Sequence, residues 1–291
     1  MPFVAVSVSL STIVCSIYTV IINVSVLYCT FISKSLIESS NLVLFYVRFA
    51  VDGLVAAMSF VLSMFTFNKL FDLDSYLVHY QFIILCTGWI NNNIMSIRAV
   101  LVIVITFDRT FAVFLPITYH KSRQNLSNSV IVVLVSCYPI VCNIVLWIIC
   151  DYIYEFIPGC VTFGCLMNQC YVRYALSFEL VTHSIIASIS LILAIKLFVW
   201  NHCTTNSKSK DIERANYIAL IDTFIIIVFD IIPSTFIAMI PPETLKEYGL
   251  LYTCCRMCGY AIEGFLVQRA LKRRKRVVSN LNNSTSQQVA K

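Results

Sequence analysis

The chain has 291 residues, of which 59% are hydrophobic and only 12% are charged, and its formal net charge is +6. A soluble domain carries about 25% charged residues, so this composition leaves too little polar surface to cover a water-soluble globule. The same hydrophobic content excludes an intrinsically disordered chain. We therefore expect an integral membrane protein.

Seven apolar segments follow one another along the chain, and each is near or above the ~20 residues that an α-helix needs to cross the hydrocarbon core. They cover about residues 4–32, 42–67, 80–107, 129–150, 175–200, 215–240 and 248–268. None shows the strict alternation of a transmembrane β-strand. The sequence therefore predicts an all-α membrane protein, a seven-transmembrane helix bundle over residues 1–268, with a basic, disordered cytoplasmic tail over residues 269–291.

The first segment contains no charged residue before Lys34. A secretory signal peptide has a basic start and a shorter apolar core, so this segment is expected to be a retained first helix.

Lys and Arg are concentrated in one set of the connections between segments, which the positive-inside rule places in the cytoplasm. This set contains Lys34, Arg109, Lys121, Arg123, Lys196, Lys208, Lys210, Arg214 and the tail from Arg269 onward, whereas the opposite set contains Lys69, Arg173 and Lys246. The N-terminus is then outside and the C-terminus inside. The net positive charge reflects this topology and not a nucleic-acid-binding surface, and the tail stretch LKRRKRVV is expected to contact anionic lipid headgroups.

Ionisable residues inside the predicted spans are Arg48, Asp52, Arg98, Glu179, Asp222, Asp230, Arg256 and Glu263. Placing such a charge in the bilayer centre costs about 2.5–3.5 kcal/mol, so these side chains are expected to face the bundle interior, to pair or to line water. Most are expected only to join helices. Glu179 and Arg256, which lie toward the outer half, are the candidates for contact with a ligand.

Asp52 and Arg98 are predicted to form a buried pair between the second and third segments. Each lies ten residues from the inner end of its segment, and both are therefore about 15 Å from the cytoplasmic face. The alternatives are that Arg98 pairs with Asp230 or Glu263, or that it reaches water.

The stretch ITFDRTFAVFLPITYH places an acid–base dipeptide, Asp108–Arg109, at the expected cytoplasmic end of the third segment. Without further context, such a pair is an interfacial charge pair that ends a helix. The stretch is similar to that of rhodopsin-like G-protein-coupled receptors, which have an Asp-Arg-Tyr triplet here and a proline at the interval of Pro116. This resemblance implies that Asp108, Arg109, Pro116, Tyr119 and, in the sixth segment, Pro233 act in switching and in G-protein coupling.

Cysteines gather in the outer connection between the fourth and fifth segments, at Cys150, Cys160, Cys165 and Cys170. Cys86 lies 22 residues before Asp108, about 33 Å along a helix, and is therefore also at the outer face. In this oxidising compartment Cys86 is predicted to bond Cys160, Cys165 or Cys170, among which the spacing does not choose. The alternatives are a free thiol at Cys86 and a metal site in the loop, although no histidine completes such a site.

Over nearly its full length the chain resembles the nematode serpentine chemoreceptors of class BC. The similarity is carried by NLVLFYVRFAVDGL, SIRAVLVIVITFDRTFAVFLPITYHKSR, CDYIYEFIPGCVTFGCLMNQCYVRY, AIKLFVWN, ANYIALIDTFIIIVFDIIPS and CGYAIEGFLVQRAL. The chain departs from ordinary rhodopsin-like receptors, since Ile231 replaces the tryptophan of the sixth helix and the Asn-Pro-x-x-Tyr motif of the seventh is absent. The resemblance implies a chemosensory receptor in the plasma membrane of a sensory neuron.

The function expected is therefore that of a G-protein-coupled receptor that binds an external small molecule within its helices and activates a heterotrimeric G protein. No catalytic residues, metal site or cofactor are expected, and the absence of a lysine between Tyr248 and Leu271 argues against a retinal protein. The alternative is a multi-pass transporter or channel subunit, which the intramembrane charges favour. Seven spans without an internal repeat argue against this alternative.

Overall fold

The computed structural model describes residues 2–32, 43–70, 80–123, 127–157, 160, 162–203, 221, 224–239 and 250–269. These residues form helices joined by turns and short irregular segments, and no β-strand lies among them. The predicted all-α fold class is confirmed. Asp222, the connection 204–220 and the tail from residue 270 onward lie outside the described residues.

The helices follow the predicted segments closely. The long ones are α1 (Pro2–Phe31), α2 (Val43–Leu70), α3 (Tyr80–Phe114), α8 (Gln169–Cys203) and a C-terminal helix, Leu250–Arg269. The fourth segment is α5 (Asn128–Ser136), α6 (Tyr138–Ile144) and the π-helical η2 (Val145–Ile149), and the sixth includes η3 (Ile226–Ile231) and α10 (Ile232–Ala238). Two short helices, α4 (Pro116–Arg123) and α7 (Phe163–Leu166), lie in connections.

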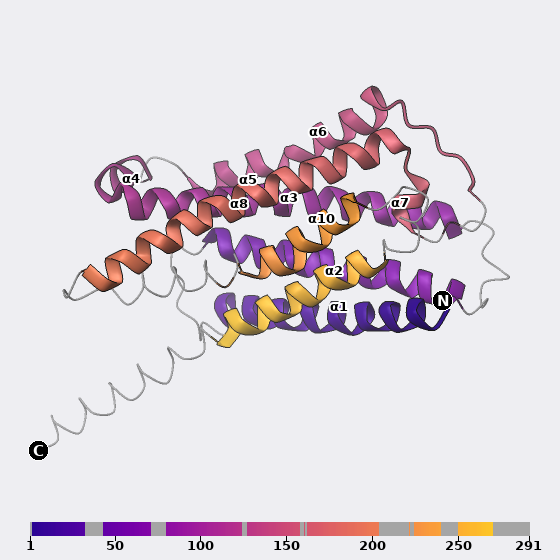
Figure 1. Ribbon diagram of the computed structural model, residues 1–291, viewed down its shortest axis with the longest axis horizontal. Helices are drawn as coiled ribbons and strands as arrows, with labels where there is room; N and C mark the ends of the chain where they lie inside the picture. The colour runs from indigo at the N-terminus through magenta and orange to yellow at the C-terminus, as the bar shows by residue number, and fades with distance from the viewer. Residues whose placement is uncertain are drawn as a thin grey trace, which may run out of the picture.

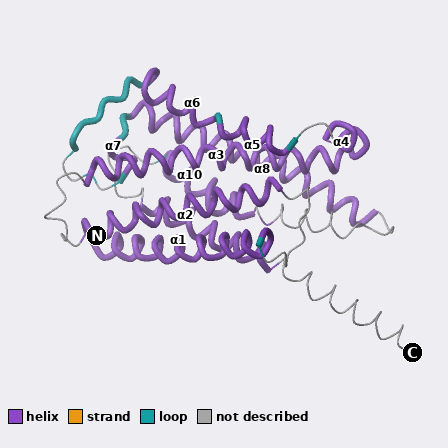
Figure 2. Tube along the Cα trace, turned by 180° about the vertical axis from the view of Figure 1, so that it is seen from behind, coloured by secondary structure: helices purple, strands orange, loops and turns teal. Residues whose placement is uncertain are grey.

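The long helices lie side by side and run in roughly the same line (Figure 1). α2 packs against α1 on one side and α3 on the other, and α3 in turn packs against α6 and α8. The chain's N-terminus and α7 lie at one end of the bundle, and α4 lies at the opposite end (Figure 2). We call these the N-terminal end and the α4 end.

α1 turns its polar face inward and its apolar face outward. The polar residues recur at helical intervals and are nearly inaccessible: Ser9, Thr12, Ser16, Thr19, Asn23 and Thr30. Between them, Val14 and Ile21 are 59% and 60% exposed. Small polar residues at helix interfaces with apolar residues outside are typical of membrane helices, because lipid and not water covers the outer surface.

Within the described ranges, five helices are long and apolar enough to cross a membrane: Val4–Phe31, Val43–Asn68, Asn128–Ile149, Gln169–Lys196 and Leu250–Arg269. α3, with 35 residues, also exceeds the length of a span. The part of the sixth segment that the structure describes is shorter, Ile226–Ile237.

The sequence led us to expect that the third helix ends at Asp108–Arg109, but it does not. α3 continues to Phe114, so Asp108 and Arg109 lie within its last two turns. The physical reason is the position of the first helix breaker: a residue that precedes proline avoids the α-helical region, and Leu115 precedes Pro116. Pro116 then begins α4, where its missing N–H leaves no bond unmade.

Proline also marks a change of winding in the sixth segment. Pro233 lies in the first turn of α10, directly after the π-helical η3. Because proline has no N–H to donate to the preceding turn, a regular α-helix cannot run through this point. The expected break in regularity is present, while the part of Pro233 in switching stays a prediction.

Candidate functional site

A large cavity of about 500 Å³ lies among the helices near the N-terminal end of the bundle. Residues of α2, α3, α7, α8, α10 and the C-terminal helix form its walls. Most of these are apolar, including Leu62, Ile84, Met95, Phe163 and Ile237. A mostly apolar cavity of this size with a few polar groups in its wall is typical of small-molecule sites.

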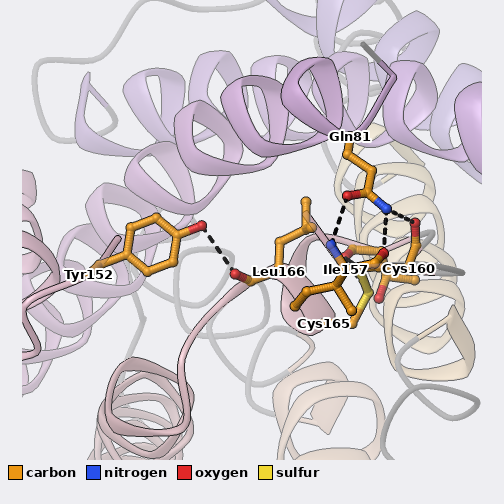
Figure 3. Close-up of a disulfide and its surroundings, with 7 residues drawn as sticks. Gln81, Tyr152, Ile157, Cys160, Cys165 and Leu166 are labelled. Carbon is orange, nitrogen blue, oxygen red and sulfur yellow. Dashed lines mark hydrogen bonds between the residues drawn. A yellow bond between two sulfur atoms is a disulfide. The ribbon is translucent and has the colours of Figure 1, made fainter. Parts of the chain in front are cut away.

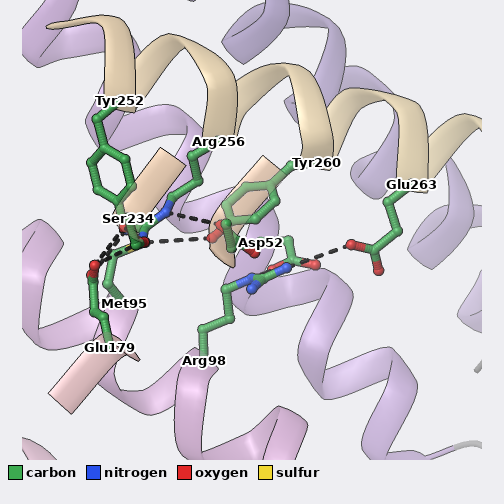
Figure 4. A network of polar contacts seen from close by, with 10 residues as sticks. Asp52, Met95, Arg98, Glu179, Ser234, Tyr252, Arg256, Tyr260 and Glu263 are labelled. Atoms are coloured by element: carbon green, nitrogen blue, oxygen red, sulfur yellow. Dashed lines mark hydrogen bonds and ion pairs between the residues drawn. The ribbon is translucent and has the colours of Figure 1, made fainter. Parts of the chain in front are cut away.

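Glu179 and Arg256, the two residues predicted to contact a ligand, both lie in the wall of this cavity and touch each other. Arg256 binds the Glu179 carboxylate through both terminal nitrogens, at 3.1 Å to Oε1 and 3.0 Å to Oε2. Its Nε lies 3.2 Å from Oδ1 of Asp230, on η3. One guanidinium therefore joins α8, η3 and the C-terminal helix (Figure 4).

Tyr252 and Ser234 complete what we call the Arg256 cluster (Glu179, Ser234, Asp230, Tyr252 and Arg256). The Tyr252 hydroxyl donates to Glu179, accepts from Arg256 and lies 3.1 Å from the Ser234 hydroxyl. Asp230 and Arg256 are buried, whereas the Glu179 side chain is 22% exposed. Glu179 is thus the charged group of the cluster that a molecule in the cavity meets first.

A small cavity of about 30 Å³ adjoins the large one. The two share wall residues, among them Met95, Glu179 and Arg256. His183 lines the small cavity, is buried, and has no hydrogen-bond partner at Nδ1. The position of this histidine in the wall that Glu179 and Arg256 also form was not predicted from the sequence.

Asp52 and Arg98 form the predicted pair. Arg98 Nε lies 2.6 Å from Asp52 Oδ1, and both residues are 3% exposed. The pair is half of a larger group, the charge tetrad of Arg48, Asp52, Arg98 and Glu263. Glu263 lies 2.5 Å from Arg48 and 3.5 Å from Arg98, so one alternative considered from sequence, a contact between Arg98 and Glu263, is present together with the predicted one.

The tetrad holds two positive and two negative charges and is therefore balanced. Arg48 Nε also lies 3.7 Å from Asp52 Oδ2, one helical turn away on α2. Paired charges of this kind tolerate burial that would be costly for an isolated charge.

Tyr260 stands between the Arg256 cluster and the tetrad (Figure 4). Its ring lies 3.9 Å from the Arg98 guanidinium carbon, and its hydroxyl donates weakly to Met95 Sδ at 3.8 Å. Tyr252, Arg256, Tyr260 and Glu263 recur at intervals of four, four and three residues, which places them on one helical face. This interval was a signal in the sequence from which Tyr252 and Tyr260 could have been found.

Asp108, at the α4 end, is bound by the connection that follows its own helix. Tyr119 donates to both carboxylate oxygens at 3.1 Å, and Arg123 Nε lies 3.0 Å from Oδ1. Burial and the adjacent Asp108 carboxylate raise the pKa of Tyr119, which keeps its hydroxyl protonated as a donor. Tyr119 and Asp108, both predicted from the motif, are thus brought together.

Arg109 lies beside α2. Its guanidinium carbon is 5.2 Å from the centre of the Phe45 ring, within the range of a cation–π contact. The carboxylate of Asp108 is directed to α4 through Tyr119 and Arg123. The described contacts join Asp108 to α4, and the part of Asp108 and Arg109 in switching stays a prediction.

The predicted disulfide of Cys86 is wrong. The loop cysteines bond one another, as Cys150–Cys170 and Cys160–Cys165, and Cys86 is a free, partly buried cysteine of α3. The position of Cys86 along its helix was expected to bring it to the loop. The four loop cysteines bond one another instead, so none of them is left to bond Cys86.

A glutamine makes the connection between loop and helix that the cysteine was expected to make. Gln81 donates to the carbonyls of Ile157 and Cys160 at 2.5 and 3.5 Å and accepts from the Ile157 N–H at 3.2 Å (Figure 3). The Tyr152 hydroxyl donates to the Leu166 carbonyl at 3.1 Å. The loop is thereby fixed over the N-terminal end of the bundle, where its α7 contributes to the wall of the large cavity.

The sequence profile of a receptor family, described as serpentine type 7TM GPCR chemoreceptor Srbc, matches residues 1–275. The chain belongs to the Srbc family of serpentine chemoreceptors. This assignment confirms the resemblance drawn from the sequence and accounts for a bundle of seven membrane-spanning segments. A search among curated proteins found no match.

The Srbc family is described as a family of chemoreceptors. Nothing among the described residues brings together three His, Cys, Asp or Glu side chains able to hold a metal ion. The cavity, the Arg256 cluster and the tetrad instead form a continuous series of polar groups from the N-terminal end toward the bundle centre.

Proposed function

We propose that this chain is a chemosensory receptor of the plasma membrane that binds an external small molecule in the large cavity and activates a heterotrimeric G protein. The observation that carries the proposal is that the charged residues in the cavity wall also join the helices to one another. Glu179 and Arg256 line the cavity, and Arg256 lies on the same helical face as Tyr260, which stacks on Arg98 of α3. A ligand at the wall therefore acts on groups that also hold the helices together.

α3 provides the mechanical link to the other end. It carries Arg98 in the tetrad and Asp108 near the α4 end, and a single α-helix connects the two. A receptor of this kind is in equilibrium between an inactive and an active conformation. A ligand shifts that equilibrium only by the difference in its affinity for the two conformations. A ligand that binds better when the Arg256 cluster is rearranged would favour a displaced α3 and loosen the hold of Asp108 on α4.

The proposed orientation places the N-terminal end outside the cell and the α4 end in the cytoplasm. Arg109, the basic residues near α4 and the connection between the fifth and sixth segments would then face the G protein. The resemblance to rhodopsin-like receptors implies this role for Arg109. Location in a sensory neuron is proposed on the family's description as chemoreceptors.

Guanine-nucleotide exchange tests the proposal directly. A screen in cells that report second messengers would identify an agonist, and the purified chain in lipid nanodiscs would then be mixed with a heterotrimeric G protein. Agonist-dependent exchange is expected for the wild type and for Arg173→Ala, an exposed change on α8 near the N-terminal end. Arg109→Ala should abolish exchange at matched receptor concentration, and normal exchange by this variant would contradict the assigned coupling role.

The alternative, a transporter or channel subunit, is favoured only by the number of charges within the membrane. Ligand-dependent current or solute flux in vesicles without any G protein would support this alternative. Absence of current, together with agonist-dependent exchange, would support the receptor.

A further inference from the structure

The Arg256 cluster, unlike the tetrad, is not electrically balanced. One guanidinium faces two carboxylates, Glu179 and Asp230, so the carboxylates of the cluster outnumber its arginine by one. Among the described residues, no second cation contacts either carboxylate. A net charge in a membrane interior is costly, so such a site favours a positive partner.

The unbalanced charge is accessible from the large cavity. Glu179 is 22% exposed on its side chain, whereas Arg256 is 7% and Asp230 2% exposed. All three nitrogens of Arg256 contact Glu179, Asp230 or Tyr252. Because Glu179 is also the most exposed of the three charged side chains, a molecule in the cavity meets this carboxylate before it meets the guanidinium.

Two further buried polar atoms of residues that line the two cavities lack partners. Asn91 Oδ1 lies in the wall of the large cavity, and His183 Nδ1 lies in the adjoining small one. The amide oxygen is an acceptor, and the imidazole nitrogen is also an acceptor in the tautomer protonated at Nε2. Both atoms have almost no accessible surface, so Glu179 is the acceptor that a ligand with N–H donors would reach from the cavity.

We infer that the large cavity takes a small organic amine, whose ammonium group binds the Glu179 carboxylate and whose apolar body fills the space between α2, α3 and α7. This inference rests on the proposed function, of which it names the ligand class. An ammonium group brings one positive charge and N–H donors, which match the charge excess and the acceptor oxygens of Glu179. An organic ion fits better than a metal ion because most of the wall is apolar.

An anionic ligand is the opposite possibility, and the same contacts argue against it. A carboxylate in the cavity would have to displace Glu179 from Arg256 and would add a third negative charge to the cluster. A neutral ligand would leave the excess charge as it is.

The test uses the full-length chain in nanodiscs and three probes that share one apolar body: 2-phenylethylamine, 2-phenylethanol and 3-phenylpropanoate. Binding is measured as a rise in Tm with probe concentration. The amine is expected to raise Tm, and to do so more than the alcohol or the carboxylate. Glu179→Gln should weaken the amine about tenfold or more, because a charged hydrogen bond is lost.

Two controls make the result independent of folding defects. Glu155→Gln removes an exposed carboxylate of the outer loop and should leave the amine's effect unchanged. Glu179→Gln itself leaves Arg256 paired with Asp230 alone, a balanced pair, so its Tm without any probe should equal or exceed that of the wild type. A lower Tm for Glu179→Gln would contradict the charge excess on which the inference depends.

The outcomes separate this inference from the proposed function. If the amine raises Tm no more than the alcohol or the carboxylate, or if its effect survives Glu179→Gln, the amine inference is overturned, while nucleotide exchange with an agonist from the cell screen still tests the receptor. If the amine binds through Glu179 but no agonist promotes exchange, the site is supported and the receptor mechanism fails.

Discussion

At the scale of single residues, the two charged groups of the bundle differ in how they tolerate change. In the charge tetrad, each acid contacts both arginines, so removal of one member leaves an uncompensated charge among buried neighbours. Loss of one partner from a buried pair typically costs about 3–5 kcal/mol, whereas removal of a balanced pair costs less.

Single and double neutralisations of the tetrad should therefore not be additive. Asp52→Asn and Arg98→Gln should each lower Tm and surface delivery, with a loss of about 3–5 kcal/mol. The double variant leaves Arg48 paired with Glu263 at 2.5 Å and should be more stable than either single one. Tm of the purified variants measures this, and a loss in the double variant that equals or exceeds the sum of the two single losses would refute the balance argument.

Exchanging the charges of Asp52 and Arg98 should restore less stability than neutralising both. Asp52→Arg combined with Arg98→Asp keeps the net charge. In the wild type, Arg48 lies 3.7 Å from the Asp52 carboxylate, so the exchange places a new guanidinium next to Arg48. Recovery should therefore be smaller than that of the double neutralisation.

Asp108 is predicted to hold the inactive arrangement through α4. Asp108→Asn weakens the contacts with Tyr119 and Arg123 and should raise basal nucleotide exchange, while Tyr119→Phe removes only the hydroxyl and should raise it less. The measurement is agonist-free GTP binding by the G protein at matched surface expression.

Asp151→Asn serves as the control for Asp108→Asn. Asp151 is exposed near the opposite end and has a φ of 44°, a conformation that asparagine also tolerates. Basal exchange equal to wild type in Asp108→Asn would show that this carboxylate does not restrain the receptor.

At the scale of elements, the outer loop is a separately braced unit. Its two disulfides close short stretches of chain, and Gln81 ties it to α3 through three hydrogen bonds. Gly88 contributes to the same contact, because a Cβ there would collide with the Phe163 ring of α7. The wall of the large cavity thus depends on an amide and a glycine of α3 and not on a bond to Cys86.

Peptide mapping should show this bonding pattern. When the chain is unfolded without reductant, Cys86 is expected to be alkylated, and the peptides recovered should link Cys150 to Cys170 and Cys160 to Cys165. Gln81→Leu should leave both links intact but speed proteolysis of the loop, because the Ile157 N–H loses an acceptor at a cost of about 1–3 kcal/mol. A peptide that joins Cys86 to a loop cysteine would contradict the arrangement.

At the scale of the whole molecule, the outward apolar surface and inward polar groups define a membrane protein but do not define its direction. We expect the distribution of Lys and Arg to define it, because basic connections tend to be retained in the cytoplasm. The end that carries α4 is the basic one, and the end that carries the disulfide-bonded loop is the one suited to an oxidising compartment.

Epitope tags should report this orientation. A tag at the N-terminus is expected to be labelled on intact cells, and a tag at the C-terminus only after the cells are permeabilised. The reverse pattern would place α4 and Arg109 outside the cell and would exclude G-protein coupling through them.

The sequence by itself predicted the apolar segments that form the long helices and the level of each residue along its segment. Helical rise is fixed at about 1.5 Å per residue and each span begins at a membrane surface, so depth follows from counting residues. Asp52 and Arg98 were placed level with each other in this way, and they do pair.

Only the tertiary structure decided which groups at the same depth are neighbours. Cys86 had the expected level along its helix, but it does not bond a loop cysteine. The ion pairs of Glu263 with Arg48 and of Asp230 with Arg256 follow from how the helices are rotated and packed. Rotation about a helix axis depends on side chains of other helices, far away in sequence. A count along one chain therefore fixes one coordinate of a residue in a membrane protein, and the packing of the bundle fixes the other two.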